Sequence, residues 1–313
     1  AYEITTRLVG SEMCIRDRPT MGYLSHHIIA DLEEDFHLLG KSTWNIEKEY
    51  AHKQALFAAA NESFGDILTV KYRTPAPSYA PATALVELMG MENMLLALYD
   101  APEHFAKALD MQTDDWLEFL SEIEARGLVA QNTDASYVGQ DSYGYSRQLA
   151  EVGARQASFA DGWGYANSQE TVGISPQMFD EVFFPSIARY AARFGLFAFG
   201  CCEPVHPLWE RSLSRLPNLR KVSVSPWCDE EAIAGYIRGK GIVYHRKPSP
   251  NGFAAAQWDE EALRAQIAKT ARAARGCPLE ITFRDITTVH GDPTRLGKAV
   301  EIARRAAMEN WQP

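Results

Sequence analysis

The sequence lacks any apolar run near the roughly 18 residues that a membrane-spanning helix needs, so no such helix is predicted. It also lacks an excess of basic residues, since 31 Lys and Arg stand against 41 Asp and Glu, a net charge of −10. Nucleic acids and anionic membranes bind basic surfaces, so neither is expected as a partner. Cysteine is scarce, and five in 313 residues predict reduced thiols and a cytoplasmic location rather than a disulfide framework.

The first twenty residues show neither helical nor alternating hydrophobic periodicity. Residues 8–18 resemble a translated sequencing adaptor of the kind found at the ends of metagenomic gene sequences. We therefore predict a non-native or disordered leader at residues 1–20 and a single domain at residues 21–313. The native N-terminus is expected to be missing.

From residue 158 onward, strand-like and helix-like segments alternate five times, with strands predicted at 158–164, 196–199, 221–227, 241–250 and 279–286. This order is typical of an α/β fold with parallel strands, and the chain length favours a (β/α)8 TIM barrel over an open sheet. Further strands are predicted at 67–72 and 128–134, so the barrel is expected to lack its first strand or strands. The long polar segment 135–153 is predicted to be a lid or an insertion near the site.

The apolar strand 196–199 ends in a turn that carries two thiols, a carboxylate and an imidazole. Substrates and metals bind at the carboxyl ends of strands in α/β proteins. We therefore predict tentative metal ligands at this turn: Cys201, Cys202, Glu203 and His206. The alternative is that both cysteines are small buried hydrophobes and that His206 lies on the surface.

Three other residues are predicted to be catalytic. Asp161, placed at the tip of strand 158–164, is a candidate general acid or base, and Glu170 is a candidate to meet the substrate. Lys247, held by Pro248 at a strand tip, is a candidate anion anchor. The alternatives are an Asp161 that caps its own turn, a solvated Glu170 and a surface Lys247. Substrate contacts are predicted for four further residues: Trp163, Gln169, Trp227 and Asp285, the last of which could instead form a plain salt bridge.

Over residues 22–311, the sequence resembles the uroporphyrinogen decarboxylase superfamily, in particular an uncharacterised branch related to corrinoid-dependent methyltransferases. The resemblance is carried by collinear motifs at 161–170 with 174–180, 200–204, 217–227, 247–250 and 284–286. It implies a TIM barrel. The decarboxylases of this superfamily use no cofactor and bind carboxylates through an arginine-rich N-terminal segment, which has no counterpart here. The methyltransferases use zinc, held by a His-x-Cys pair and a later cysteine, to activate a substrate thiol.

The zinc pattern of the methyltransferases is only partly present. Gly200 stands two residues before Cys202, where the pattern has histidine, and Cys277 precedes the last strand instead of following it. Zinc would then need replacement ligands, for which Glu203, His206, Cys228 and His290 are the candidates.

Three functions remain open. The first is a methyltransferase-like enzyme that acts on a small methylated or thiol substrate, with zinc and a separate corrinoid protein as partner. The second is a cofactor-independent decarboxylase of a porphyrinogen-like substrate, and the third is a non-catalytic ligand-binding barrel. Unpaired sheet edges in an incomplete barrel also make a homodimer an expectation.

Overall fold

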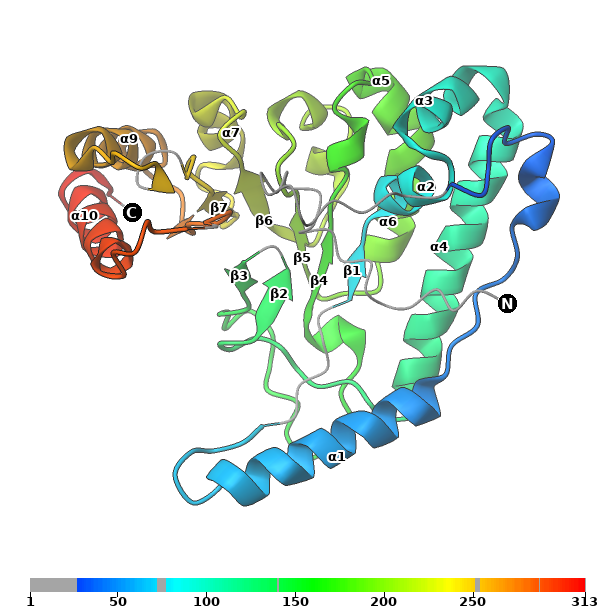
Figure 1. Cartoon of the computed structure of the whole chain (residues 1–313), viewed down its shortest axis with the longest axis horizontal. Helices are drawn as coiled ribbons and strands as arrows, with labels where there is room; N and C mark the ends of the chain where they lie inside the picture. Colours follow the sequence, from blue (N-terminus) through cyan, green and yellow to red (C-terminus); the bar gives the residue numbers. More distant parts are fainter. Residues whose placement is uncertain (1–26, 72–76, 140, 251–253, 287, 313) are drawn as a thin grey trace.

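The computed structural model describes residues 27–71, 77–139, 141–250, 254–286 and 288–312. The predicted leader at residues 1–20 lies outside them. The described chain is built around a curved parallel sheet of six strands in the order β1-β4-β5-β6-β7-β8 (Figure 1). No pairing between β8 and β1 is found within these residues, so the sheet is compatible with a (β/α)8 barrel but is not a closed one.

The strands of the sheet are short and pair in parallel register throughout. They are β1 (Ser78–Tyr79), β4 (Trp163–Ala166), β5 (Leu196–Phe199), β6 (Leu219–Val224), β7 (Val243–Arg246) and β8 (Leu279–Ile281). A separate antiparallel hairpin is formed by β2 (Tyr137–Gly139) and β3 (Ser142–Tyr143).

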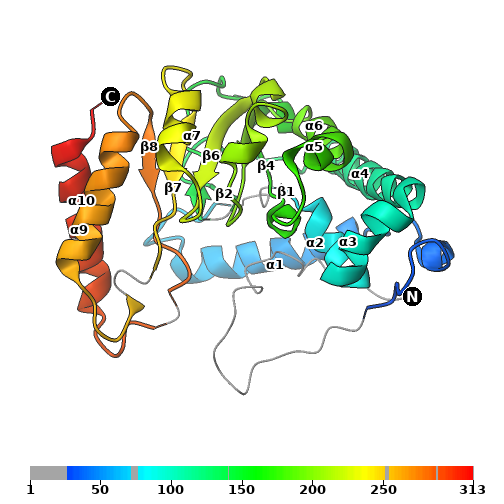
Figure 2. The ribbon, with the colours of Figure 1, turned by 90° about the horizontal axis from the view of Figure 1, so that it is seen from above.

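Helices connect the strands, and an arc of them from α10 round to α4 follows one side of the sheet (Figure 2). The helices are α1 (Ile46–Phe64), α2 (Pro81–Met89), α3 (Met91–Asp100), α4 (Pro102–Ala125), α5 (Pro176–Met178), α6 (Phe184–Ala191), α7 (Glu230–Ile237), α9 (Glu260–Ala273) and α10 (Thr294–Asn310). Single turns are η1 (Asp35–Leu38), η2 (Phe159–Asp161), η3 (Gln169–Thr171), η4 (Phe179–Phe183), η5 (His206–Leu208) and η6 (Leu213–Arg215). None of the described helices is both long and apolar enough to span a membrane.

Three helices begin at side-chain caps. The Ser175 hydroxyl accepts the Met178 amide at α5, and the Asp229 and Asp259 carboxylates accept first-turn amides at α7 and α9. Each cap satisfies an amide that has no partner within the helix.

The two faces of the sheet pack against different partners because successive strand residues point to opposite sides. Along β5, Phe197 packs against Tyr190 of α6 and Phe199 against Phe179 of η4. Leu196 and Ala198 instead belong to an inner cluster with Val138 of the β2–β3 hairpin. The hairpin therefore lies on the inner face, and the strand ends that follow are held between the hairpin and the outer helices.

Three of the predicted strands are wrong in position. Residues 158–161 form a capped turn, η2, and the strand begins only at Trp163. Residues 128–134 form no strand, and the described part of segment 67–72 forms none either. On the side of β4 opposite β5, the paired strand is β1, which begins at Ser78. Local β propensity at 67–72 therefore does not decide where the chain joins the sheet.

Candidate active site at the carboxyl end of the sheet

The turn after β5 places two thiols side by side. The Sγ atoms of Cys201 and Cys202 lie 3.5 Å apart, Cys201 is fully buried and Cys202 is half-buried. Gly200 opens the turn with φ of +101°. The neighbouring strands fix the turn through its carbonyl groups, since the Tyr165 hydroxyl donates to Gly200 O at 3.1 Å and the Ser223 hydroxyl donates to Cys201 O at 2.8 Å.

Glycine at position 200 excludes the histidine of the zinc pattern. A Cβ atom there would lie 2.9 Å from Val205 Cγ1 and 3.1 Å from Ser223 Cβ, and the left-handed backbone is strained for any residue with a side chain. The absence of a His-x-Cys pair is therefore a consequence of how this turn is folded.

Glu203 closes the turn from inside the protein. It is buried, and its carboxylate accepts the Ser168 amide through Oε1 at 2.8 Å and the Cys201 amide through Oε2 at 2.7 Å. Burial raises the pKa of this carboxyl, although both amide bonds and the nearby Lys247 oppose the shift. Glu203 thus ties the chain leaving β4 to the chain leaving β5.

Two cations lie near the thiols, and one of them, Arg284, contacts Cys201. Arg284, just beyond β8, places Nη1 3.2 Å from Cys201 Sγ, and its Nε lies 3.0 Å from Asp285 Oδ2. Lys247, just beyond β7, is only 1% exposed, and within the part of the chain that the structure describes its Nζ has no hydrogen-bond partner. Burial lowers the pKa of Lys247. A buried ammonium without acceptors is unfavourable unless a ligand supplies them.

A second buried lysine lies on the same face and, unlike Lys247, has hydrogen-bond acceptors for its ammonium group among the described residues. Lys221 of β6 donates to Glu280 Oε2 at 2.6 Å, to Ser142 Oγ at 2.6 Å and to Tyr143 O at 2.7 Å. Two of these acceptors come from the β2–β3 hairpin. All three ammonium donors of Lys221 thus have acceptors, which sets Lys247 apart.

The segment 135–153 lies beside the site, as expected of an insertion there. Its hairpin contacts Lys221, and Asp141 at the hairpin turn accepts the Thr282 hydroxyl through its carbonyl at 3.2 Å. The Asp141 carboxylate also lies 3.8 Å from Arg284 Nε. The hairpin therefore covers the inner face of the sheet next to the cations.

Asp161 does not lie at this site, and its predicted placement at a strand tip is wrong. It occupies η2, which precedes β4, so it lies at the amino end of the sheet, away from the thiols. Its carboxylate accepts the Ser158 amide at 2.8 Å and pairs with Arg155. The capping alternative considered for this residue is what the structure shows, and the geometry gives Asp161 no part in the chemistry at the thiols.

Replacing Asp161 with Ala is expected to lower the free energy of unfolding by about 0.5–2 kcal/mol at neutral pH, because the side chain that accepts the Ser158 amide is lost. Arg155 is half exposed, so solvent screens its ion pair and the cap dominates. Arg155 and Ser158 hold the pKa of Asp161 well below its ordinary 3.8. The stabilisation is therefore present above pH 3.8 and is lost as the pH falls through the lowered pKa. Urea unfolding at neutral and strongly acidic pH measures it, and equal stabilities at neutral pH would contradict the prediction.

Glu170 and Gln169 lie in η3, at the carboxyl end of β4. Glu170 is buried, and its Oε1 accepts the Thr83 hydroxyl at 2.8 Å and the Gln169 amide at 3.1 Å. Its Oε2 has no hydrogen-bond partner among the described residues. Glu170 is thus not the solvated charge considered as an alternative. Among the described residues, none of its hydrogen bonds reaches the thiols, although the neighbouring Ser168 amide donates to Glu203.

The remaining predicted substrate contacts are scattered. Trp163 opens β4, where its Nε1 donates to Gly144 O of the hairpin segment at 2.8 Å and its ring faces Lys221. Trp227 is 74% exposed after β6, whereas Asp285 lies beside Arg284 with φ of +60°. Only Asp285 is thereby brought to the thiols, through Arg284. Arg284 itself is not among the residues predicted from the sequence, although it stands in a motif of the resemblance.

Of the predicted metal ligands, only Cys201 and Cys202 bring their side chains together. His206 Nδ1 accepts the Asp229 amide at 3.2 Å, Cys228 Sγ lies 3.6 Å from Ser225 Oγ, and both Glu203 oxygens accept backbone amides. His290 Nε2 lies 3.1 Å from Ala254 O. In the described ranges no three His, Cys, Asp or Glu side chains are grouped so that they could hold a metal ion. These residues do not fit zinc, whose structural and catalytic sites use at least three protein ligands.

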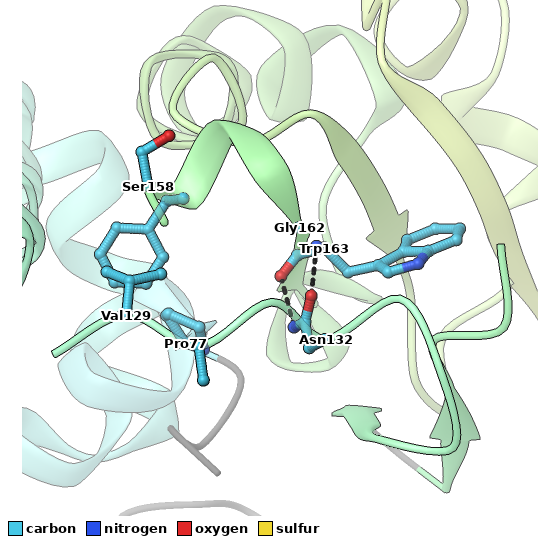
Figure 3. A pocket seen from close by; sticks show the side chains of 8 residues that line it. Pro77, Val129, Asn132, Ser158, Gly162 and Trp163 are labelled. Carbon is cyan, nitrogen blue, oxygen red and sulfur yellow. Dashed lines mark hydrogen bonds between the residues drawn. The ribbon is translucent and has the colours of Figure 1, made fainter. Parts of the chain in front are cut away.

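Two hollows lie outside the thiol site. A small cavity of about 10 Å³, room for a single water, lies at the amino end of β4, where Asn132 bridges the Trp163 backbone (Figure 3). A wider hollow of about 480 Å³ lies beyond β6 and is lined in part by His206, Trp227 and Cys228. Neither includes Lys247 or Arg284 in its lining.

No protein-family model and no curated protein matches the sequence. Among solved structures, a methyltransferase from Methanosarcina mazei is similar in fold, with a TM-score of 0.52 and 12% sequence identity over 90% of this chain and 70% of that chain. This likeness supports the methyltransferase-like α/β fold that the resemblance implied. The superfamily assignment itself stays a prediction.

Proposed function

We propose that this protein is a methyltransferase-like enzyme of the uroporphyrinogen decarboxylase superfamily, and that it acts on a small thiol or methylated compound bearing an anionic group. The observation that carries the proposal is the buried Lys247 ammonium without an acceptor, beside Arg284 and the thiol turn. Both cations follow the carboxyl ends of neighbouring strands of the parallel sheet, where α/β enzymes bind substrates. The fold shared with a methyltransferase supports the reaction class.

The roles of this chain's residues follow from their positions. Lys247 binds the anionic group of the substrate. The oxygens of that group then accept the hydrogen bonds for which the buried ammonium has no other acceptor among the described residues. Arg284, fixed by Asp285, lowers the free energy of a second negative charge, such as a substrate thiolate. Glu203 holds the turn in place. A corrinoid on a separate protein would supply or receive the methyl group, and no step is assigned to zinc because the described ligands do not fit it.

The direct test uses methylcobalamin as methyl donor and 3-mercaptopropionate as acceptor, with 2-mercaptoethanol as a matched thiol without a charge. The enzyme is expected to accelerate loss of the methylcobalamin absorbance with 3-mercaptopropionate. The rate should be at least about tenfold higher than with 2-mercaptoethanol, because one charge-assisted contact contributes about 1.5–3 kcal/mol. Equal rates for the two thiols would argue against anion binding by Lys247. No acceleration with either thiol would argue against methyl transfer.

A decarboxylase of a porphyrinogen-like substrate is the second candidate, because two buried cations at one strand edge also suit a carboxylate. Asp161, a candidate general acid or base from the sequence, lies at the amino end of β4 and is given no part in this reaction. Carbon dioxide release from uroporphyrinogen, without methyl transfer, would favour this candidate. Binding of either compound without turnover would instead favour a ligand-binding barrel.

A further inference from the structure

Cys201 and Cys202 form a pair that the proposed function does not use. Their Sγ atoms lie 3.5 Å apart on adjacent residues, and neither thiol is in a disulfide. The other described cysteines lie singly: Cys228 contacts Ser225, and Cys277 donates to Ala234 O. The pair is therefore one place among the described residues where a single atom could reach two sulfurs.

The number of ligands decides which kind of atom such a pair can hold. A metal ion that needs three or four protein ligands is not served here, because no third His, Cys, Asp or Glu joins the pair in the described part of the chain. Thiolate sulfur prefers soft partners. A trivalent arsenic atom with one organic substituent needs only two more bonds, and two thiols supply them.

We propose that Cys201 and Cys202 form a two-thiol binding site for a soft, trivalent ligand atom, of which a monosubstituted arsenical is the chemical type. With an organic arsine oxide, two arsenic–sulfur bonds form and the arsenic–oxygen bonds break. The two thiol protons leave with the oxygen as water. Arsenic stays trivalent, so the step needs neither an oxidant nor a reductant.

The burial of the two thiols sets the order of bonding. Cys202 is half-buried and meets the ligand first, whereas Cys201 is fully buried and bonds second. The hydrogen bond to Cys202 and burial raise the pKa of Cys201, which leaves it protonated until its neighbour has reacted. Arg284 Nη1, 3.2 Å from Cys201 Sγ, continues to donate to this sulfur in the adduct. The site is independent of methyl transfer, so either proposal can fail alone.

The experiment treats the whole chain, reduced with a phosphine, with phenylarsine oxide and measures adducts by intact mass and thiols by titration in denaturant. One adduct per chain is expected, and the titratable thiols fall from the five of the sequence to three, because two are consumed. Excess 2,3-dimercaptopropanol should restore all five.

Matched variants separate the pair from the other thiols. Cys201→Ser and Cys202→Ser should each lose the dimercaptan-reversible adduct, whereas Cys228→Ser should keep it and fall from four thiols to two. Cys202→Ser changes a half-buried side chain, so it keeps the test decisive if Cys201→Ser does not fold. Absence of an adduct in the wild type, or its survival in folded Cys202→Ser, would overturn the proposal.

Discussion

Lys247→Met is expected to make the protein more stable and, at the same time, inactive. Methionine has a similar length and keeps the buried volume filled, but it carries no charge. Removing a buried ion in favour of a well-packed apolar side chain stabilises proteins by about 1–4 kcal/mol. Lys247 is a suitable case because it is 1% exposed and its Nζ has no hydrogen-bond partner among the described residues. In the methylcobalamin assay with 3-mercaptopropionate, kcat/KM should fall about 100-fold, the size of a lost buried charge contact.

The gain in stability should depend on pH in a defined direction. Burial lowers the pKa of Lys247 below its ordinary 10.5, so the folded protein gives up this proton at a lower pH than the unfolded chain. The cost of the charge is fully present below the lowered pKa and disappears as the pH rises towards 10.5. The difference in unfolding free energy between Lys247→Met and wild type should therefore be largest below the lowered pKa, shrink as the pH rises through it, and vanish near pH 10.5. Chemical unfolding across this pH range measures it.

Lys221→Met is the matched control, because it removes the other buried lysine of the same face. That ammonium donates to Glu280, Ser142 and Tyr143, so its loss leaves acceptors unpaired and is expected to destabilise the protein. Opposite signs for the two variants would support the assignment of Lys247 as a residue kept for binding. A Lys247→Met variant that is less stable than wild type near neutral pH would contradict it.

The order of elements could be predicted from the sequence because buried parallel strands and capped helices leave strong local signals. The apolar run 196–199 is β5, and Ser175, Asp229 and Asp259 are capping residues at the starts of α5, α7 and α9. Parallel pairing then follows from the alternation of strands with helices. The closure of the sheet could not be predicted in this way, since it depends on long-range pairing that no local pattern encodes.

The position of Asp161 shows how an error of a few residues changes a functional interpretation. The sequence Ser158-Phe-Ala-Asp161 suits both a strand tip and a capping box, and the structure contains the capping box. Moving the strand start to Trp163 transfers Asp161 from the carboxyl end of the sheet to the amino end. Only hydrogen bonding to Arg155 and Ser158, which the sequence does not reveal, decides between the two.

The positions of the thiols and Lys247 at strand ends could be predicted because they follow buried apolar strands. Arg284 could not, since a lone arginine after a strand is usually exposed. For Lys247, the signal in the sequence is the alternation of side chains between the two faces of the sheet along β7 and just beyond it. His245 and Lys247 share the inner face, whereas Arg246 pairs with Glu230 on the side of α7. Burial of these charges is a tertiary property, because it depends on the hairpin that covers them.

Glu203→Gln is expected to lower the free energy of unfolding by about 1–3 kcal/mol, although the two side chains have nearly the same shape. Both carboxylate oxygens accept backbone amides, from Ser168 and Cys201, inside the protein. An amide group has one oxygen and one nitrogen that can only donate, so one of the two backbone amides loses its acceptor. Glu203→Ala removes both acceptors and leaves a cavity, so we expect a loss of about 3–5 kcal/mol.

The same variants should affect the site because Glu203 joins the chain after β4 to the turn after β5. When the Cys201 amide is unpaired, the thiol turn is no longer held at a fixed distance from Arg284. The phenylarsine oxide adduct should therefore form more slowly in Glu203→Gln than in wild type. Glu210→Gln, an exposed change a few residues away, is the control and should alter neither property. Thermal and urea unfolding measure the first effect, and timed mass spectrometry measures the second. A Glu203→Gln variant with wild-type stability would show that the carboxylate does not hold the turn, and the structural basis assigned to the site would be wrong.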